Sequence, residues 1–139
     1  MVYNLSEENS ILLHFLSEIR DVKIQKDRWR FRNNIKRIGM LIGYEISKVL
    51  SYRPIETQTP LGIDTSRELD QHPVIATILR AGLPLHDGIL EVFDNAENAF
   101  IGAYRKHHKS GDFEIKLEYM ATPELNGKDL ILCDPMLAS

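Results

Sequence analysis

The feature that most restricts the fold of this chain is a short, uninterrupted apolar run, Val74 to Leu79. Successive side chains of a strand point to opposite faces of its sheet, so such a run indicates a strand that is buried on both faces. A second apolar run, Asp129 to Cys133, lies near the C-terminus. Strands covered on both faces are typical of parallel sheets with helices packed against them, and the two runs therefore predict an α/β fold.

The remaining segments supply further elements. Apolar residues with a period of three to four predict two N-terminal helices, Ser6–Arg20 with Ser6 as its cap, and Asp27–Leu50. Alternation between prolines at Pro54–Leu61 predicts an edge strand or hairpin arm. We further expect a helix at Leu83–Phe93, strands at Asn98–Tyr104 and Phe113–Met120, and a loop at Arg105–Asp112.

These elements predict a single α/β domain over residues 1–139, with a largely parallel sheet, an N-terminal helical layer and a β-arm. We place the helical lead-in at about 1–52, the strand arm at 53–72 and the front of the α/β core at 73–139. A length of 139 residues suits one domain.

Charge and composition exclude several classes of protein. The net charge is −3, which does not suit a general nucleic-acid or membrane binder. Basic residues cluster between Lys23 and Arg37, and we interpret them as mostly solvent-facing, with contact to a partner subunit as the alternative. The single cysteine, Cys133, the lack of a signal-peptide pattern and the absence of a run of about 18–20 apolar residues predict a cytoplasmic protein.

The residues after the first buried run carry chemistry. Arg80 follows the strand directly, where a sheet opens towards ligands, and its planar guanidinium suits phosphate oxygens. Gly82 allows close approach of the backbone, and the next helix offers N–H groups to an anion. The alternative is that Arg80 pairs with a structural carboxylate.

The second apolar run delivers an acid, Asp134, to a strand end, and the small residues Ala138 and Ser139 follow. This order is typical of the start of a phosphate-binding loop, and the acid could hold ribose hydroxyls or Mg²⁺. Cys133 beside it is expected to be a buried small hydrophobe. Two further side chains are expected to be structural, His86 exposed at a helix start and Trp29 packed.

Four segments together make the chain resemble the uracil phosphoribosyltransferase family, within the type I phosphoribosyltransferases. They are Ile78–Leu83, Asp87–Leu90, Ile101–Arg105 and Asp134–Ser139. The resemblance implies transfer of phosphoribosyl from 5-phosphoribosyl 1-diphosphate to uracil, giving UMP and diphosphate in pyrimidine salvage. It also implies Mg²⁺ carried with the phosphoribosyl diphosphate, and no metal site made by the protein itself.

The resemblance assigns site residues one by one. Arg80, Ala81 and Gly82 match the diphosphate loop, where a non-proline cis peptide is expected at or beside Arg80. Arg105 matches a second diphosphate-contacting arginine on the loop that it opens. Asp134 is expected to orient the ribose in the transition state. The start of the ribose 5-phosphate loop is matched by Asp134, Pro135, Met136, Leu137, Ala138 and Ser139.

The resemblance covers only the front portion of the family's sequence, and no residue here matches the uracil site. We therefore expect a truncated chain that is inactive alone and exposes apolar surface near Val74–Leu79 and Leu130–Cys133. A homo-oligomer, dimer or higher, is expected, with no nucleic-acid or membrane partner. Two alternatives stay open: a catalytically dead regulatory or binding module, including one linked to RNA, and another phosphoribosyltransferase or one fused to a uridine kinase.

Overall fold

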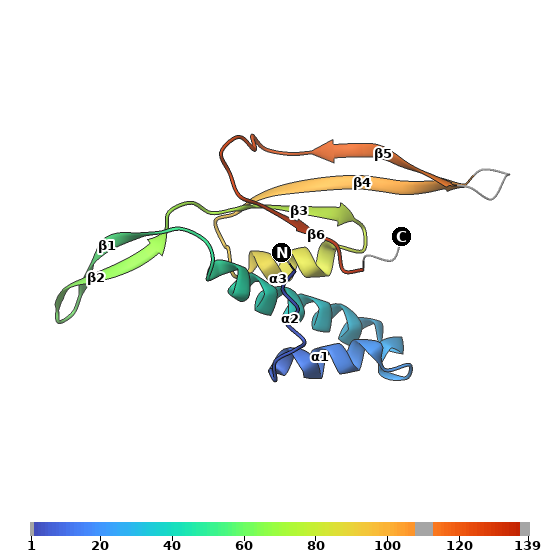
Figure 1. Cartoon of the computed structure of the whole chain (residues 1–139), viewed down its shortest axis with the longest axis horizontal. Coiled ribbons are helices and arrows are strands. Elements are labelled where there is room, and N and C mark those ends of the chain that lie inside the picture. The colour runs from blue at the N-terminus through green and yellow to red at the C-terminus, as the bar shows by residue number, and fades with distance from the viewer. Residues whose placement is uncertain (1, 108–112, 137–139) are drawn as a thin grey trace.

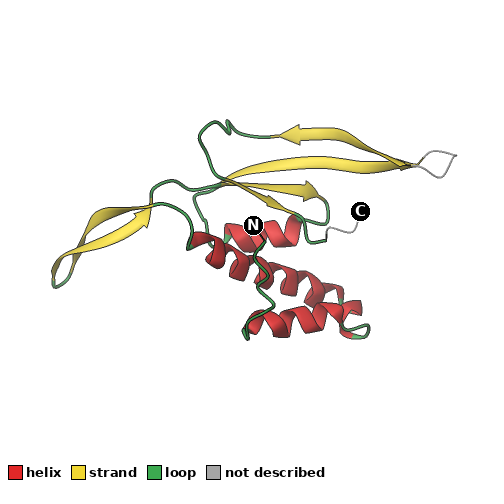
Figure 2. Ribbon diagram, viewed as in Figure 1, coloured by secondary structure: helices red, strands yellow, loops and turns green. Residues whose placement is uncertain are grey.

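The computed structural model describes residues 2–107 and 113–136 as a layer of helices packed against one face of a sheet, with a separate hairpin arm (Figures 1 and 2). The elements are α1 (Ile11–Arg20), the 3₁₀ helix η1 (Ile24–Lys26), α2 (Arg28–Ser47), β1 (Tyr52–Thr59), β2 (Gly62–Leu69), β3 (Val74–Leu79), α3 (Leu83–Leu90), β4 (Glu97–His107), β5 (Phe113–Ala121) and β6 (Leu130–Cys133).

The main sheet has the order β5-β4-β3-β6. Strand β3 pairs in parallel with β4 on one side and with β6 on the other, whereas β4 and β5 form an antiparallel pair. The predicted α/β fold is confirmed, but the sheet is mixed, because β4 and β5 form a long hairpin.

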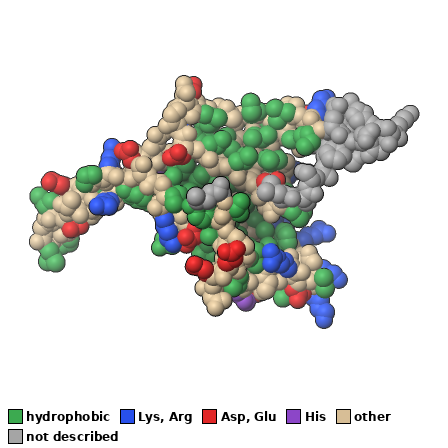
Figure 3. Space-filling model, in the orientation of Figure 1, with side chains coloured by type: hydrophobic (Ala, Val, Ile, Leu, Met, Phe, Trp, Pro, Cys, Tyr) green, Lys and Arg blue, Asp and Glu red, His purple; other side chains and the backbone are tan. Residues whose placement is uncertain are grey.

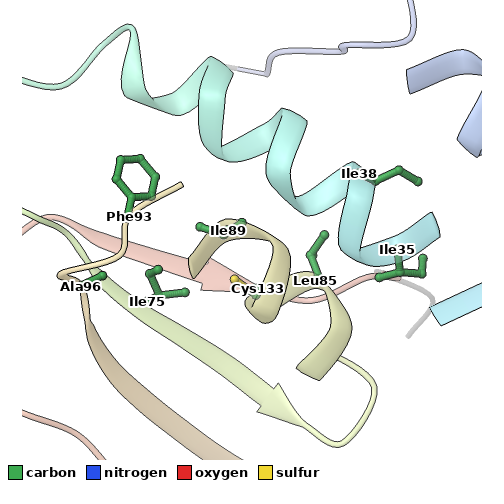
Figure 4. Packing of buried hydrophobic residues seen from close by; sticks show 8 residues of the cluster. All are labelled: Ile35, Ile38, Ile75, Leu85, Ile89, Phe93, Ala96 and Cys133. Atoms are coloured by element: carbon green, nitrogen blue, oxygen red, sulfur yellow. The ribbon is translucent and has the colours of Figure 1, made fainter. Parts of the chain in front are cut away.

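The core lies between the sheet and α3, which α2 covers in turn. Ile75 of β3 and Cys133 of β6 face Leu85 and Ile89 of α3, and Phe93 closes one end (Figure 4). The first four residues of β3, Val74–Thr77, are all buried, so the prediction of a strand covered on both faces is confirmed for them. The exposed apolar surface expected at this strand is accordingly absent from Val74–Thr77.

Strand β6 differs, because only one of its faces is covered. Ile131 and Cys133 pack towards α3, whereas Leu130 and Leu132 are 50% and 55% exposed. The expected open apolar surface is therefore present at β6, and the expectation of a strand buried on both faces is wrong there.

Helices α2 and α3 approach each other closely through two glycines. A Cβ on Gly88 would lie 2.0 Å from the Lys36 carbonyl oxygen, and one on Gly39 would lie 2.5 Å from the Leu85 carbonyl oxygen. This contact fixes α3, and with it the loop that precedes α3.

Several predicted boundaries are wrong. Helix α1 begins after Ser10, not after Ser6, because the Asn4 side chain accepts hydrogen bonds from the Ser6 N–H and hydroxyl and holds a turn there. Helix α2 begins after Asp27, whose carboxylate accepts from the next helical N–H groups, and ends at Ser47. Helix α3 ends at Leu90, three residues before the predicted end.

Polar segments near two strands also differ from expectation. Residues 105–107, predicted as loop, continue β4 and pair with β5. The predicted arm is a complete hairpin, because β2 returns along β1 in antiparallel register from Tyr52–Leu69 to Thr59–Gly62.

Candidate functional site

The two loops singled out in the sequence emerge side by side at the carboxyl edge of the sheet. Strands β3 and β6 are parallel neighbours, with Thr77 opposite Cys133, so Arg80–Gly82 and Asp134–Met136 leave the same edge (Figure 1). Ligands of open α/β sheets bind outside this edge. The topology therefore brings the two predicted phosphate-binding loops together.

Gly82 is the point of contact between these two loops. A Cβ at Gly82 would lie 2.0 Å from the Thr77 hydroxyl, 2.8 Å from the Ile78 carbonyl oxygen and 3.0 Å from the Cys133 carbonyl oxygen. The Thr77 hydroxyl donates to the Cys133 carbonyl oxygen at 3.4 Å. Only glycine fits this position, so the backbone after Arg80 lies against the ends of both strands.

The Arg80 loop turns tightly into α3. The Leu79–Arg80 peptide bond is cis, as the family resemblance implied. The Gly82 N–H donates to the Ile78 carbonyl, and the Leu83 N–H donates to the Arg80 carbonyl. Arg80 is exposed and has no ion-pair partner among the residues that the structure describes, so the alternative of a structural carboxylate gains no support there.

Asp134 stands half-buried at the end of β6. Its Oδ1 accepts from the Met136 N–H at 3.2 Å, which bends the chain after the strand. Pro135 is half-buried and Met136 is 73% exposed. The other predicted residues of this loop, Leu137, Ala138 and Ser139, lie outside the described residues.

Arg105 lies on β4, the other neighbour of β3, and its backbone pairs with Ile115. Gly102 of β4 is level with Leu79, so Arg105 stands three residues, or roughly 10 Å, beyond the end of β3. The sequence placed Arg105 at the start of a loop; the structure places it on a strand that overhangs the carboxyl edge.

Two residues near the site, His86 of α3 and Asn98 of β4, join the helix to the sheet in a way that the sequence did not reveal. His86 was expected to be exposed but is buried, and its Nε2 lies 2.7 Å from Asn98 Oδ1 on β4. Because an amide oxygen only accepts, Nε2 carries the proton. The bond ties the first turn of α3 to β4, and no local pattern in the sequence signals it.

The described residues at this edge offer few groups for nucleophilic attack by a thiol or for metal binding. Burial raises the pKa of the Cys133 thiol to about 11, which favours the predicted role of a buried hydrophobe over that of a nucleophile. Among the described residues no group of three His, Cys, Asp or Glu side chains could hold a metal ion.

Three cavities of the described chain lie away from the sheet edge. Two cavities of about 450 and 550 Å³ flank the N-terminal segment where it crosses α1 and α2. A third, of about 290 Å³, lies between α2 and α3 at Lys36 and Glu91. None of these three cavities is lined by the loops that follow β3 and β6.

Comparison with known proteins gives one consistent result. The model of the family described as uracil phosphoribosyltransferase matches residues 6–139. A curated uracil phosphoribosyltransferase of Porphyromonas gingivalis is 49% identical over 138 residues, covering 99% of this chain and 64% of the relative. One of Methanothermobacter thermautotrophicus is 37% identical, covering 95% of this chain and 60% of the relative.

A solved structure, that of the AQ2163 protein from Aquifex aeolicus, matches with a TM-score of 0.81 and 28% sequence identity. The match covers 99% of this chain and 63% of the Aquifex chain. The chain therefore spans somewhat less than two thirds of the length of the proteins that it matches.

Proposed function

Because the chain belongs to the uracil phosphoribosyltransferase family, we propose that its carboxyl-edge loops bind 5-phosphoribosyl 1-diphosphate for transfer of the phosphoribosyl group to uracil. The products are UMP and diphosphate, and the reaction belongs to cytoplasmic pyrimidine salvage. We also infer a fold of the type I phosphoribosyltransferase kind. The observation that carries the proposal is the contact of Gly82 with the ends of both β3 and β6, which joins the Arg80 loop to the Asp134 loop.

In this proposal the Arg80 loop binds the diphosphate. Departure of diphosphate places negative charge on the leaving oxygens, and preorganised donors at that position lower the barrier. Arg80 supplies a charged, planar donor. The first turn of α3 adds the Leu85 N–H, because Pro84 has no N–H and the Leu83 N–H donates to the Arg80 carbonyl. Arg105, on the overhanging strand β4, supplies a second cation.

The Asp134 loop binds the ribose in the same proposal. As the bond to diphosphate breaks, positive charge grows on the ribose ring, and a carboxylate that accepts from its hydroxyls orients the sugar and favours that charge. Asp134 Oδ1 accepts from the Met136 N–H, and in the proposal Oδ2 is left to accept from the ribose hydroxyls. We assign uracil to no residue of this chain.

We propose that Mg²⁺ enters with the phosphoribosyl diphosphate as part of the substrate. The ion neutralises diphosphate oxygens as they leave. Asp134 lies at the start of the loop assigned to the ribose, so in this proposal its carboxylate acts on the ribose and Mg²⁺ acts on the diphosphate.

The test is titration of the purified chain with Mg²⁺ and phosphoribosyl diphosphate, followed by calorimetry. Hydrogen bonds to charged groups contribute about 1.5–3 kcal/mol, so Arg80→Gln is expected to weaken binding by roughly 10- to 100-fold. Arg67→Gln on the arm removes the same charge far from the loop and serves as the control. Equal affinity of the two variants would contradict the proposal.

We further propose that the protein self-associates through the arm. Strands β1 and β2 pair with each other, and no other described helix or strand packs extensively against them. Leu61 is fully exposed and Ile63 is 69% exposed. An isolated two-stranded hairpin is marginally stable in water, so contact with a second copy of the chain would stabilise the arm.

A further inference from the structure

One end of the molecule, at the turn between α1 and α2, is strongly basic although the chain is acidic overall. Residues 20–37 hold eight of the 17 Lys and Arg residues but only two of the 20 Asp and Glu residues. The remainder of the chain therefore holds nine basic and 18 acidic residues. Figure 3 shows the basic side chains gathered at this end.

Three of the eight basic side chains are engaged within the fold. Arg30 donates from Nε and Nη2 to Glu18, at 3.0 and 2.7 Å. Lys36 pairs with Glu91 at 2.7 Å, and Arg37 lies over the Phe15 ring, 5.3 Å from its centroid. The other five are exposed and form no ion pair with the side chains that the structure describes, those of residues 2–103 and 115–136: Arg20, Lys23, Lys26, Arg28 and Arg32.

Exposed apolar side chains lie among these five cations. Val22 is 68% exposed, Trp29 is 64% exposed, and Ile24 is 36% exposed. We call the five cations and these three apolar residues the basic tip. Single exposed apolar residues are ordinary, but three within eight positions beside five cations form a combined surface.

The turn that presents the tip is held by its two acids. Asp21 Oδ1 accepts from the Lys23 and Ile24 N–H groups at 2.7 and 2.9 Å. Asp27 Oδ1 accepts from the Trp29 and Arg30 N–H groups, both at 3.0 Å. The carboxylates thus bond to the backbone of the turn, which fixes the positions from which the cations and apolar side chains project.

We propose that the basic tip docks on the surface of a membrane that contains anionic phospholipid. Clustered Lys and Arg bind anionic headgroups, while Trp and aliphatic side chains enter the interface beside them. Arg20 lines one of the three described cavities, and the other seven residues of the basic tip lie outside them. Val22 and Ile24 are aliphatic, which suits lipid, whereas single-stranded nucleic acid is bound by successive aromatic stacking platforms and the tip contains one, Trp29.

The charge distribution also sets the orientation of docking. The acidic remainder of the chain is repelled by an anionic surface, so the tip approaches first. None of the described helices is both long and apolar enough to cross a lipid bilayer, and surface docking requires no such helix. The proposal is independent of the proposed transferase function.

The chain carries its own reporter, because Trp29 is its only tryptophan and lies in the basic tip. The experiment is sedimentation of the full chain with vesicles of phosphatidylcholine containing about 30% phosphatidylglycerol, and with vesicles of phosphatidylcholine alone. Tryptophan fluorescence is read in parallel. We expect binding to the anionic vesicles only, a blue shift of the Trp29 emission, and loss of both at roughly 1 M salt, where charges are screened within about 3 Å.

Two double variants distinguish the contribution of the basic tip to vesicle binding from that of the net charge. Each cation near an anionic surface is worth about fivefold in partitioning, so Arg28→Gln/Arg32→Gln is expected to lower the vesicle partition coefficient roughly 25-fold. Arg67→Gln/Lys116→Gln removes the same charge from the arm and β5 and is expected to retain binding. Both pairs are exposed, and matched thermal melts check that each variant is folded.

Three outcomes would overturn the proposal. They are the absence of binding to anionic vesicles, equal binding to both kinds of vesicle, and equal loss in the two double variants. Quenching of Trp29 by single-stranded RNA without any vesicle binding would assign the tip to nucleic acid instead, because stacked bases quench indole whereas lipid shifts its emission to the blue.

Discussion

At the scale of single residues, the site depends on the lack of a side chain at position 82. Gly82 lies where any Cβ would meet the Thr77 hydroxyl at 2.0 Å and two carbonyl oxygens at 3.0 Å or less. The carbonyl oxygens belong to the ends of β3 and β6, which the core holds in place. A larger residue must therefore displace the Arg80 loop rather than its neighbours.

The substitution Gly82→Ala tests this arrangement. Overpacking of this kind costs about 1–3 kcal/mol, so we expect a fall in Tm of several degrees and a loss of phosphoribosyl diphosphate binding of at least tenfold. Calorimetric titration and thermal melts measure the two effects. Asp94→Ala, beyond the far end of α3, is the control. Unchanged affinity in Gly82→Ala would show that the loop position does not matter for binding.

The sequence predicted part of this residue-scale picture. Arg80 and Asp134 were recognisable because each polar residue directly follows an apolar strand, and the cis bond beside Arg80 followed from the family resemblance. The contact of Thr77 with Cys133 and Gly82 could not be predicted, because it depends on the register between strands 56 residues apart. His86 was misjudged because its partner, Asn98, comes from a different element.

At the scale of elements, α1 and α2 are joined by a buried carboxylate. Glu18 is 7% exposed and accepts two hydrogen bonds from Arg30 and one, at 2.6 Å, from Asn34. These bonds, Arg30 first, lower the pKa of Glu18 from 4.5 to about 2. The interpretation of the basic segment as mostly solvent-facing holds for Arg30, whose side chain is 46% exposed. Its ion pair with an acid of α1 was not predicted, because the pair depends on how the two helices pack.

This pair predicts a particular pH dependence. A carboxyl group whose pKa is lower in the folded state stabilises that state above its unfolded pKa of 4.5, and the stabilisation is lost as pH falls towards 2. Glu18→Gln is therefore expected to lower Tm at neutral pH and to flatten the decline of Tm between about pH 5 and pH 2. Glu56→Gln, exposed on the arm, is the control. Parallel curves for wild type and Glu18→Gln would refute the role of Glu18.

Element boundaries were less predictable than the elements themselves. Apolar runs and periodicity located the three α-helices and five of the six strands of the described residues, but local side chains set the ends. Asn4 delays the start of α1, and pairing with β5 extends β4 through residues 105–107, which look like a loop because they are polar.

At the scale of the whole molecule, the helical layer and sheet leave the arm without a support of its own. The sequence predicted an edge strand or hairpin arm from the prolines and the alternation near Pro54. The return strand β2 was not predicted, because its residues are mostly exposed and polar. Leu61 and Ile63 of the arm are exposed, and a contact between two copies of the chain would cover them.

Substitutions on the two faces of the arm test the proposed self-association. Burying a large aliphatic side chain contributes about 1.5–3 kcal/mol, so Ile63→Lys is expected to raise the dissociation constant roughly 10- to 100-fold. Thr57 pairs with Asp64 in the hairpin, one position along the strand from Ile63, so its side chain points to the opposite face. Thr57→Lys therefore adds the same charge to the same arm and is expected to associate as the wild type does. Sedimentation velocity over a range of concentrations measures all three proteins. A monomeric wild type, or equal association of the two variants, would exclude the arm as the contact, whereas selective loss in Ile63→Lys would identify the face that a second copy covers.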